Sequence, residues 1–327
     1  MEEKTIDVFG IGSALMDIII EVDDRTLMDF KLNKGEMILI EQDQAKEMLD
    51  KISHLPMQNF PGGSVSNTIA GIANLGGIGA FFGKIGDDKH GDLYETILEK
   101  EGIKGNMVKS DSFQTGHAIT FITPDKERSF ATHLGAAVNL KKPDFIDEDL
   151  KRSKILHLEA YQLEAPEIKE LILHAVEIAK ENNVQVSIDL NDAGLIKRNL
   201  EAFKTFVQDH VDIVFANDSE AEAFTELDDP EGALHEIAEM CHIACVKLGD
   251  QGSFIKTDID FFKIEPFSTN PISSTGAGDM YAAGILYGIT HALPLPEAGK
   301  IASYAAAKVV AQMPARLNEK VDISSIQ

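Results

Sequence analysis

The sequence predicts an α/β fold in which a central, mostly parallel sheet is flanked by helices and carries a small inserted β-sheet lid. The first observation is that short apolar runs alternate with longer amphipathic segments between about residues 155 and 250. The second is a group of strand-like runs in the first half of the chain that lack long helices between them. The third is the length of 327 residues, which allows one large folding unit.

The parallel sheet is predicted from four apolar runs, at residues 155–158, 184–188, 213–216 and 243–246. Pro166 opens the segment after the first run, and apolar residues spaced by three or four predict a helix to about residue 182. Strands joined by helices run parallel, and their ligands bind beyond the carboxyl ends. Polar or glycine-rich residues follow three of these runs, so we expect a site built from several loops.

The lid is predicted from strand-like runs at residues 18–22, 37–40, 117–122 and 129–132. We expect two insertions to form it, at roughly residues 14–42 and 106–134. No proline- or serine-rich linker separates these segments from the rest, so residues 1–327 are expected to form a single domain.

The composition excludes several classes of protein. Apolar residues make up 44% and charged residues 26%, as in ordinary globular proteins. A net charge of −24 is poorly suited to nucleic acid or to an anionic membrane surface. Cys241 and Cys245 have neither redox-pair nor zinc-ligand spacing and are expected to be buried thiols. With no signal region and no apolar span of about 18 residues, we expect a cytoplasmic protein without nucleic-acid or membrane partners.

Gly10 and Gly12 follow the first strand-like run and invite comparison with a dinucleotide-binding turn. The third glycine of that motif is replaced by Leu15, which argues against a dehydrogenase. The chain also lacks the glycine and lysine pattern of a P-loop and the glycine and serine pattern of a nucleophile elbow.

The first informative glycine-rich segment contains Gly62 and Gly63. Ser64 is expected to cap a helix in which Val65, Ile69 and Ile72 form a buried stripe. The two glycines allow a ligand to approach the main chain, and Asn67 presents an amide that both donates and accepts hydrogen bonds. Such a group suits a sugar hydroxyl, although a tight turn before a close-packed helix would need the same glycines.

The second segment places Gly276, Ala277 and Gly278 before a helix rich in small residues. Successive amides at a helix start form a binding site for phosphate oxygens. Asp279 lies beside this site, where a carboxylate would repel phosphate unless it accepts a proton from the attacking hydroxyl. With an ordinary pKa of about 3.9 it is ionised at neutral pH. The alternative role is a favourable helix-end charge.

Together, Gly62-Gly63 with Asn67 and Thr275-Gly-Ala-Gly-Asp279 resemble the two signatures of the ribokinase-like (PfkB) family of carbohydrate and nucleoside kinases. The resemblance covers nearly the whole chain, in order. It implies a ribokinase-like fold, transfer of the γ-phosphoryl group of ATP to an alcohol, and Mg²⁺ as the cofactor.

The resemblance also implies roles for individual residues. Asp279 matches the general base, and the anion hole matches Gly276, Ala277 and Gly278. The residues that grip the acceptor match Asp17, Gly62, Gly63 and Asn67. The ATP-binding positions match Asn217, Glu220, Lys247, Gly249, Gly252 and Thr275. Of these, Glu220 is expected to arrange Mg²⁺ through water.

Within the family, residues 35–41, 61–64, 115–117 and 127–136 most resemble the adenosine kinases. This resemblance implies the 5′-hydroxyl of a nucleoside as acceptor. Leu39 and Phe130 of the lid, with Tyr161, would then sandwich the purine, unless they only pack in the core. Arg128 is expected to approach the transferred phosphate or to pair with a lid carboxylate. In many members an aspartate that helps to hold a monovalent cation stands where this chain has Ser273, so the resemblance leaves dependence on such a cation open.

Two other functions stay open from the sequence. A sugar kinase of the same family, of the ribokinase, fructokinase or 2-keto-3-deoxygluconate kinase type, would use the same Asp17, Asn67 and Asp279. A noncatalytic nucleotide-binding relative is disfavoured by the intact Asp279 and its glycine-rich turn. The partners expected are small molecules, ATP and a nucleoside or sugar, and the chain is expected to be a monomer or a homodimer.

Overall fold

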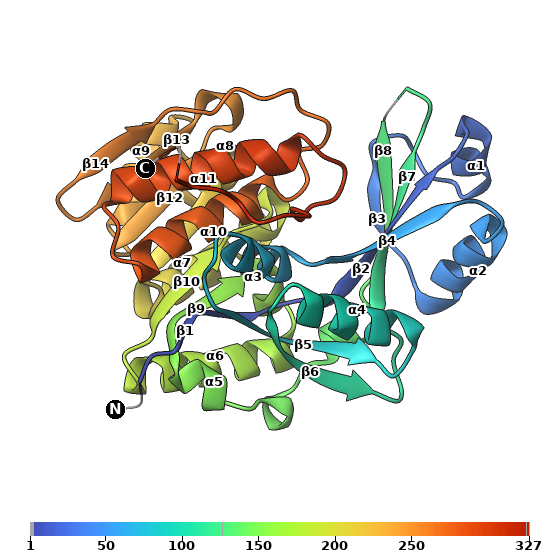
Figure 1. Cartoon of the computed structure of the whole chain (residues 1–327), viewed down its shortest axis with the longest axis horizontal. Coiled ribbons are helices and arrows are strands. Elements are labelled where there is room, and N and C mark those ends of the chain that lie inside the picture. Colours follow the sequence, from blue (N-terminus) through green and yellow to red (C-terminus); the bar gives the residue numbers. More distant parts are fainter. Residues whose placement is uncertain (1–2, 126, 325, 327) are drawn as a thin grey trace.

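The computed structural model describes residues 3–125, 127–324 and 326 and contains two sheets (Figure 1). The strands of the large sheet are β1 (Ile6–Ile11), β5 (Gly79–Gly86), β6 (Lys104–Ser110), β9 (Ser153–Glu159), β10 (Gln185–Asp189), β11 (Ile213–Asn217), β12 (Ile243–Lys247), β13 (Ser253–Thr257) and β14 (Phe261–Ile264). Their order is β14-β13-β12-β11-β10-β9-β1-β5-β6. Neighbours from β6 to β12 are parallel, and β13 and β14 are antiparallel. The predicted fold class is confirmed.

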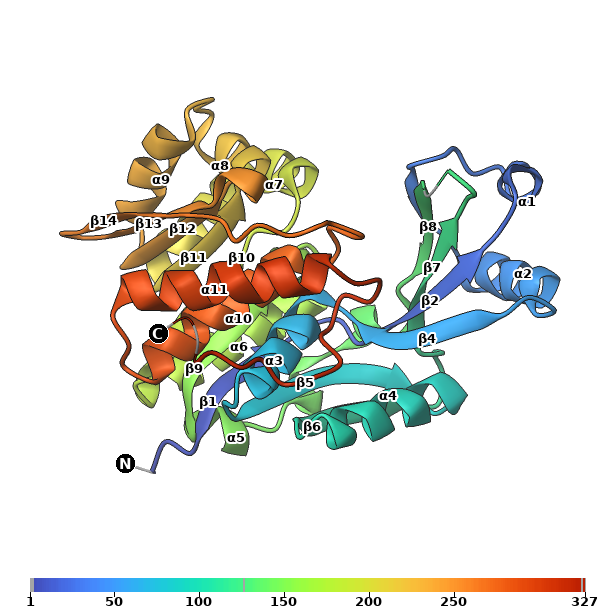
Figure 2. The same cartoon turned by 45° about the horizontal axis from the view of Figure 1, so that its top comes forward.

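Helices cover both faces of the large sheet (Figure 2). One face is covered by α3 (Ser64–Asn74), α4 (Lys89–Lys100), α10 (Ala277–Thr290) and α11 (Leu295–Val310). The other is covered by α5 (Glu148–Lys151), α6 (Pro166–Glu181), α7 (Ala193–His210), α8 (Asp218–Thr225) and α9 (Pro230–Ala238). Short 3₁₀ helices are η1 (Gly135–Asn139), η2 (Lys142–Asp144), η3 (Ala160–Leu163) and η4 (Gly249–Gln251).

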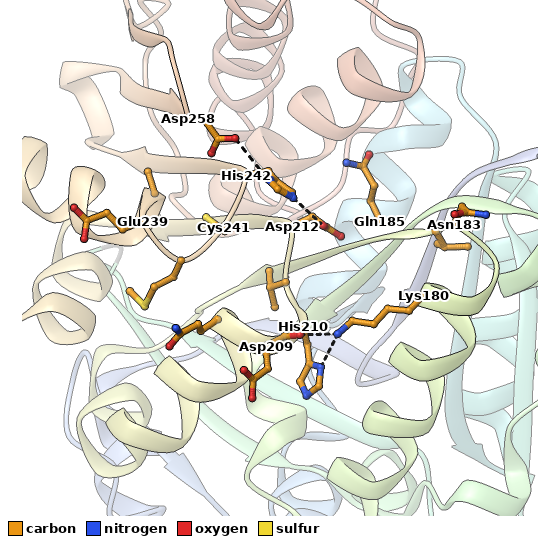
Figure 3. Close-up of a pocket in the computed structure, with 15 residues that line it drawn as sticks. Lys180, Asn183, Gln185, Asp209, His210, Asp212, Glu239, Cys241, His242 and Asp258 are labelled. Atoms are coloured by element: carbon orange, nitrogen blue, oxygen red, sulfur yellow. Dashed lines mark hydrogen bonds and ion pairs between the residues drawn. The ribbon is translucent and has the colours of Figure 1, made fainter.

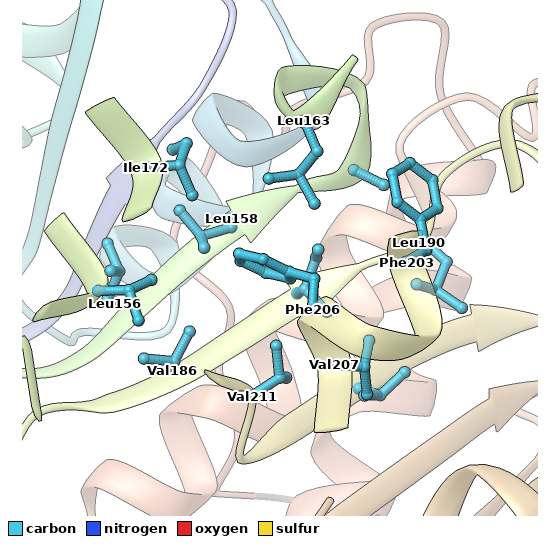
Figure 4. Packing of buried hydrophobic residues seen from close by; sticks show 14 of the residues in the cluster. Leu156, Leu158, Leu163, Ile172, Val186, Leu190, Phe203, Phe206, Val207 and Val211 are labelled. Carbon is cyan, nitrogen blue, oxygen red and sulfur yellow. The ribbon is translucent and has the colours of Figure 1, made fainter. Parts of the chain in front are cut away.

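Burial on both faces explains why the strands of this sheet are almost continuously apolar. In β1, Val8 packs with the α3 and α10 side, whereas Phe9 packs with the α6 and α7 side. Figure 4 shows the second of these clusters, where Leu156 of β9 and Phe206 of α7 interdigitate with the residues around them.

The small sheet contains β2 (Leu15–Glu21), β3 (Met37–Leu39), β4 (Met57–Gly62), β7 (Gly116–Ile122) and β8 (Arg128–His133), in the order β3-β8-β7-β2-β4. Two helices, α1 (Asp24–Asp29) and α2 (Gln42–Ile52), cover its outer face. Strand pairing fixes which residues share a face, because partners in register point to the same side. The outer face includes Ile119 and Ala131, and the inner face includes Arg128 and Phe130.

The lid segments differ from the expected 14–42 and 106–134 at two places. β4 pairs with β2 and belongs to the small sheet, although its sequence Met-Gln-Asn-Phe-Pro-Gly does not alternate apolar and polar residues. β6 belongs to the large sheet instead, because α4 connects it to β5 as a parallel crossover.

Both cysteines are buried and unpaired in the structure, as the sequence predicted. Within the described residues, no helix is both long enough and apolar enough to span a membrane.

Candidate active site

The predicted site residues gather where the carboxyl ends of the parallel strands meet the small sheet. Asp189 ends β10, Asn217 ends β11 and Lys247 ends β12. At the same edge, α3 and α10 begin side by side (Figure 1). The fold therefore joins the two glycine-rich segments, although 215 positions separate Ser64 from Asp279.

Asp279, in the first turn of α10, accepts hydrogen bonds from two side chains of α3. The Ser64 hydroxyl donates to Oδ1 at 2.7 Å, and Nδ2 of Asn67 donates to Oδ2 at 2.9 Å. The Ser64 hydroxyl oxygen also accepts a hydrogen bond from the side-chain Nδ2 of Asn191 at 3.0 Å. These contacts fix the carboxylate and leave other lone pairs of its oxygens for a further donor.

Burial raises the pKa of Asp279 to about 6, whereas the hydrogen bonds from Asn67 and Ser64 lower it. Asp189 raises this pKa further and Lys247 lowers it. The carboxylate is therefore still mainly ionised at pH 7, but it is a stronger base than an ordinary aspartate. A base with its pKa near the working pH is well suited to proton transfer.

The start of α3 differs from the expected cap. Gly63, with φ of 94°, is the N-cap, and Ser64 is the first helical residue. A Cβ atom at Gly63 would collide with the carbonyl oxygen of Ser13, so only glycine fits this turn. Ser64 is free to donate to Asp279 because it does not cap its own helix, and the buried stripe of Val65, Ile69 and Ile72 is confirmed.

The start of α10 presents backbone amides. Gly276 is the N-cap with φ of 80°, and the first intrahelical bond runs from the Met280 amide to its carbonyl. The Ala277 amide donates to the Ser274 carbonyl at 3.2 Å. The amides of Gly278 and Asp279 lie in the first turn, where helix geometry supplies no acceptor. They can bind an anion. The prediction that the Ala277 amide also points outward is wrong, because the turn uses that amide in its bond to Ser274, and Gly276 shapes the turn as the N-cap.

Lys247 supplies a positive charge beside these amides. Its Nζ forms an ion pair with Oδ2 of Asp189 at 2.7 Å, and a Cβ atom at Gly278 would lie 3.1 Å from Nζ. Burial lowers the pKa of Lys247, but the carboxylates of Asp189 and Glu220 more than offset this effect, so its pKa is raised. The side chain therefore keeps its charge next to the start of α10.

Asp17 on β2 lies against the turn before α3. A Cβ atom at Gly62 would lie 2.5 Å from Oδ1 of Asp17, so glycine makes room for the carboxylate. Burial raises the pKa of Asp17 to about 7, Arg316 lowers it, and the charge of Asp279 raises it. The four residues predicted to grip the acceptor, including Asn67, thus lie around Asp279.

Asn217 and Glu220 form a capping box at the start of α8. The Asn217 side chain accepts from the Glu220 amide at 2.8 Å, and the Glu220 carboxylate accepts from the amide and side chain of Asn217. Burial, followed by the charge of Asp189, raises the pKa of Glu220 to about 7. The pair therefore has a structural function at the start of α8, and its role in arranging Mg²⁺ stays a prediction.

The remaining ATP-binding predictions lie in two turns. Gly249 and Gly252 have φ of 60° and 90° in the connection between β12 and β13. Thr275, before α10, has its hydroxyl 3.4 Å from Arg128 of the small sheet. Arg128 also donates to Ser273 and to the sulfur of Met313, so in the described part of the chain it contacts the loop before α10 and the segment after α11.

The three predicted base-binding residues come from two parts of the fold. Leu39 and Phe130 lie on the inner face of the small sheet, which also carries Met37. Leu39 is 64% exposed and Met37 is 57% exposed. Tyr161 lies in η3 after β9 and is 46% exposed.

Sequence reasoning missed several polar residues that hold the site together. Asn191 orients Ser64, and Arg316 contacts Asn67. The buried carboxylate of Glu159 accepts from the Ser13 amide and hydroxyl and from the Val65 amide. None of these residues belongs to a glycine-rich motif. Glu159 and Asn191 each follow a predicted strand, at the ends where a site was expected, whereas Arg316 has no such signal.

A cavity of about 610 Å³ lies at the amino ends of β10, β11 and β12, away from these residues (Figure 3). Its polar side chains contact one another: Lys180 lies 3.1 Å from Nδ1 of His210, and His242 lies between Asp212 and Asp258. Parallel sheets bind ligands at the opposite ends of their strands, so this cavity is not the candidate site.

Known proteins resemble this chain over most of its length. The model of the pfkB family of carbohydrate kinases matches residues 20–321. The structure of adenosine kinase from Sinorhizobium meliloti is 34% identical, with a TM-score of 0.88, and 97% of both chains is covered. A probable sugar kinase from Rhizobium etli is 33% identical with the same TM-score, and 97% of this chain and 96% of that chain are covered. The 5-dehydro-2-deoxygluconokinase of Bacillus licheniformis is 27% identical, and 95% of this chain and 92% of that protein are covered.

The family match thus spans both glycine-rich segments, and the structure joins these segments around one carboxylate, Asp279. The chain belongs to the pfkB family of carbohydrate kinases, and it is a kinase with a ribokinase-like fold that acts on a hydroxyl group.

Proposed function

We propose that this kinase transfers the γ-phosphoryl group of ATP to the 5′-hydroxyl of a nucleoside, as an adenosine kinase does. The observation that carries the proposal is a group of apolar side chains on the inner face of the small sheet, where Met37 and Leu39 are largely exposed beside Phe130. Exposed apolar side chains grouped at a site indicate an apolar ligand. A flat base fits such a surface, whereas a free sugar has hydroxyls on every side.

Asp279 is proposed as the general base. Its carboxylate accepts the proton of the acceptor hydroxyl while the oxygen attacks the γ-phosphorus and the bond to ADP breaks. The transition state is loose, so most of the acceleration comes from positioning and charge neutralisation. The amides of Gly278 and Asp279 and the ammonium of Lys247 would stabilise the transferred group. Asp17 and Asn67 would hold the sugar hydroxyls.

Mg²⁺ is the cofactor that the family implies. It usually keeps several waters and binds through one or two carboxylates together with substrate phosphates. The carboxylates at the strand ends fit this mode, because Glu220 and Asp189 offer oxygen ligands beside Lys247. Glu220 would contact the ion through water, since its oxygens already accept hydrogen bonds from Asn217. When bound, the ion would neutralise phosphate charge.

A coupled ADP-release assay tests the acceptor. It should be run with adenosine, other nucleosides, ribose, fructose and 2-keto-3-deoxygluconate. We expect kcat/KM to be highest for a nucleoside, and a higher value for one of the sugars would contradict the proposal.

A sugar kinase is the second candidate. The Rhizobium and Bacillus relatives favour it, together with the polar contacts that Asp17 and Asn67 offer. It would share the base and the anion hole, and it would differ only in having no use for the apolar side chains on the inner face.

Variants of that face distinguish the two candidates. For Leu39→Ala we expect KM for the nucleoside to rise about 10-fold or more, because burying a leucine is worth about 1.5–3 kcal/mol. Initial rates over a range of nucleoside concentrations measure this change. Met28→Ala is the matched control, since Met28 is 76% exposed on α1 of the outer face. Equal KM values for the two variants would favour the sugar kinase.

The contact of Arg128 with the loop before α10 makes a prediction about water. Closure of the small sheet over the acceptor is expected to exclude water from the γ-phosphoryl group. ATP hydrolysis without acceptor should therefore be slow, and Arg128→Ala should raise it relative to transfer. Phosphate release measured with and without nucleoside tests this, and equal ratios in wild type and variant would contradict it.

A further inference from the structure

Arg316 is buried in the segment that follows α11 and contacts the side of Asn67 that faces away from Asp279. The side chain is 4% exposed. Its Nε donates to Oδ1 of Asn67 at 3.0 Å, and its Nη2 donates to the Ser66 hydroxyl at 2.6 Å. The other terminal nitrogen of the guanidinium, Nη1, forms an ion pair with Oε2 of Glu101 at 2.8 Å. Three different acceptors therefore hold the guanidinium in one orientation.

The contact with Arg316 determines which end of the Asn67 amide faces the carboxylate. Oδ1 of Asn67 accepts from Arg316, so Nδ2 is directed to Oδ2 of Asp279. If the amide turned over, its NH₂ group would face the guanidinium and its oxygen would face the carboxylate. Both contacts would then be repulsive, so the charge of Arg316 disfavours this orientation.

The same segment is attached to the rest of the site at two further points. A Cβ atom at Gly276 would lie 2.9 Å from Cα of Ala315, so Ala315 packs against the turn before α10. The sulfur of Met313 accepts a hydrogen bond from Arg128 of the small sheet. The segment thus contacts α3, the turn before α10 and the small sheet.

We propose that Arg316 is a positioning residue for phosphoryl transfer: it orients the Asn67 amide so that Asn67 donates to Asp279 and keeps the base ionised. The inference rests on the proposed function of Asp279. It gives a kinetic role to a residue near the carboxyl end of the chain that lies outside both glycine-rich motifs. Without Arg316, Asp279 loses a directed donor and its proton affinity rises.

Arg316→Gln should lower kcat at pH 7 by about 10- to 100-fold, the range that corresponds to losing a hydrogen bond to a charged group. The acidic limb of kcat against pH should move to higher pH, because a carboxylate with fewer donors binds its proton more tightly. A residue with only a structural role would lower the melting temperature and leave this limb in place. Asp189 and Lys247, which also shift the pKa of Asp279, are unchanged in the variant, whereas the pKa of Asp17 rises because Arg316 lowers it in the wild type. A more neutral Asp17 would lower the pKa of Asp279, so Asp17 does not explain a limb that moves to higher pH.

Two further variants keep the test independent of folding. Arg316→Lys retains a positive charge beside Asn67 but lacks the planar guanidinium that donates in several directions. Its kcat and the pH of its acidic limb should lie between those of wild type and Arg316→Gln. Lys154→Met removes the ion pair with Asp7 at the amino end of β9, and this control should change the melting temperature alone.

A double-mutant cycle shows whether Arg316 acts through Asn67. We expect Arg316→Gln to have little further effect on kcat in an Asn67→Ala background, because residues in one network are not additive. Additive effects, or an acidic limb that stays in place in Arg316→Gln and Arg316→Lys, would overturn the inference. Asp279→Asn, measured in parallel, separates the two proposals. If Asp279→Asn stays active, Asp279 is not the general base. If it is inactive and the Arg316 effects are additive, only the proposed role of Arg316 is wrong.

Discussion

Asp279→Asn is expected to lower kcat by at least about 10²-fold, the lower end of what general-base assistance contributes. The variant should fold, because an asparagine has nearly the same shape and can still accept from Ser64 or Asn67. It lacks the negative oxygen that takes the proton of the attacking hydroxyl. Steady-state rates with saturating ATP and acceptor measure the change, and circular dichroism checks the fold.

The pH dependence of kcat in the wild-type enzyme is a second test of Asp279 as the base. The pKa of about 6 means that Asp279 gains a proton as the pH falls through 6. Activity should therefore fall on the acidic side with an apparent pKa near this value. If Asp279→Asn has a turnover close to that of wild type, Asp279 is not the base. The affinity for ADP is the control, and it should be unchanged because the nucleotide contacts remain in the variant.

The sequence predicted the architecture well because its signals are local and repeated. The runs that became β9 to β12 are short and apolar and are separated by longer segments, which is the pattern that burial on both faces of a parallel sheet produces. The strand β4 escaped prediction because it is held by pairing with β2 rather than by its own pattern. The boundaries of the lid therefore depend on contacts between distant segments.

The site was predictable only where a motif has its own chemistry. Asp279 and Asn67 could be named from the glycines beside them, but the hydrogen bond that joins them spans 212 positions. Arg316 has no such motif, and an isolated arginine in a sequence is most often a surface residue. Its contacts with Asn67 and Ser66 exist only because the chain returns to α3 after α11. The Ser64 cap was wrong for a related reason, since the turn geometry at Gly63 decides which residue ends the loop.

Asp17→Asn is expected to stabilise the protein at pH 8 and to weaken acceptor binding. Burial raises the pKa of Asp17 to about 7, whereas an unfolded chain has an aspartate pKa of about 3.9. The folded protein thus binds more protons between these values, and its free energy of unfolding falls as the pH rises through this window. Three pKa units correspond to about 4 kcal/mol, so the variant should gain about 2–4 kcal/mol above pH 7.

The gain should be less than half as large at pH 5, and it should disappear below about pH 4, where Asp17 is neutral in both the folded and the unfolded protein. Thermal unfolding at pH 5 and pH 8 measures it, with Asp43→Asn, an exposed site on α2, as the matched control. Equal stabilisation at both pH values would show that burial of the charge is not the cause. If KM for the acceptor rises while stability rises at pH 8, the carboxylate is retained for binding at a cost in stability. Such a loss of stability in exchange for binding is expected of a buried carboxylate whose charge serves the ligand rather than the fold.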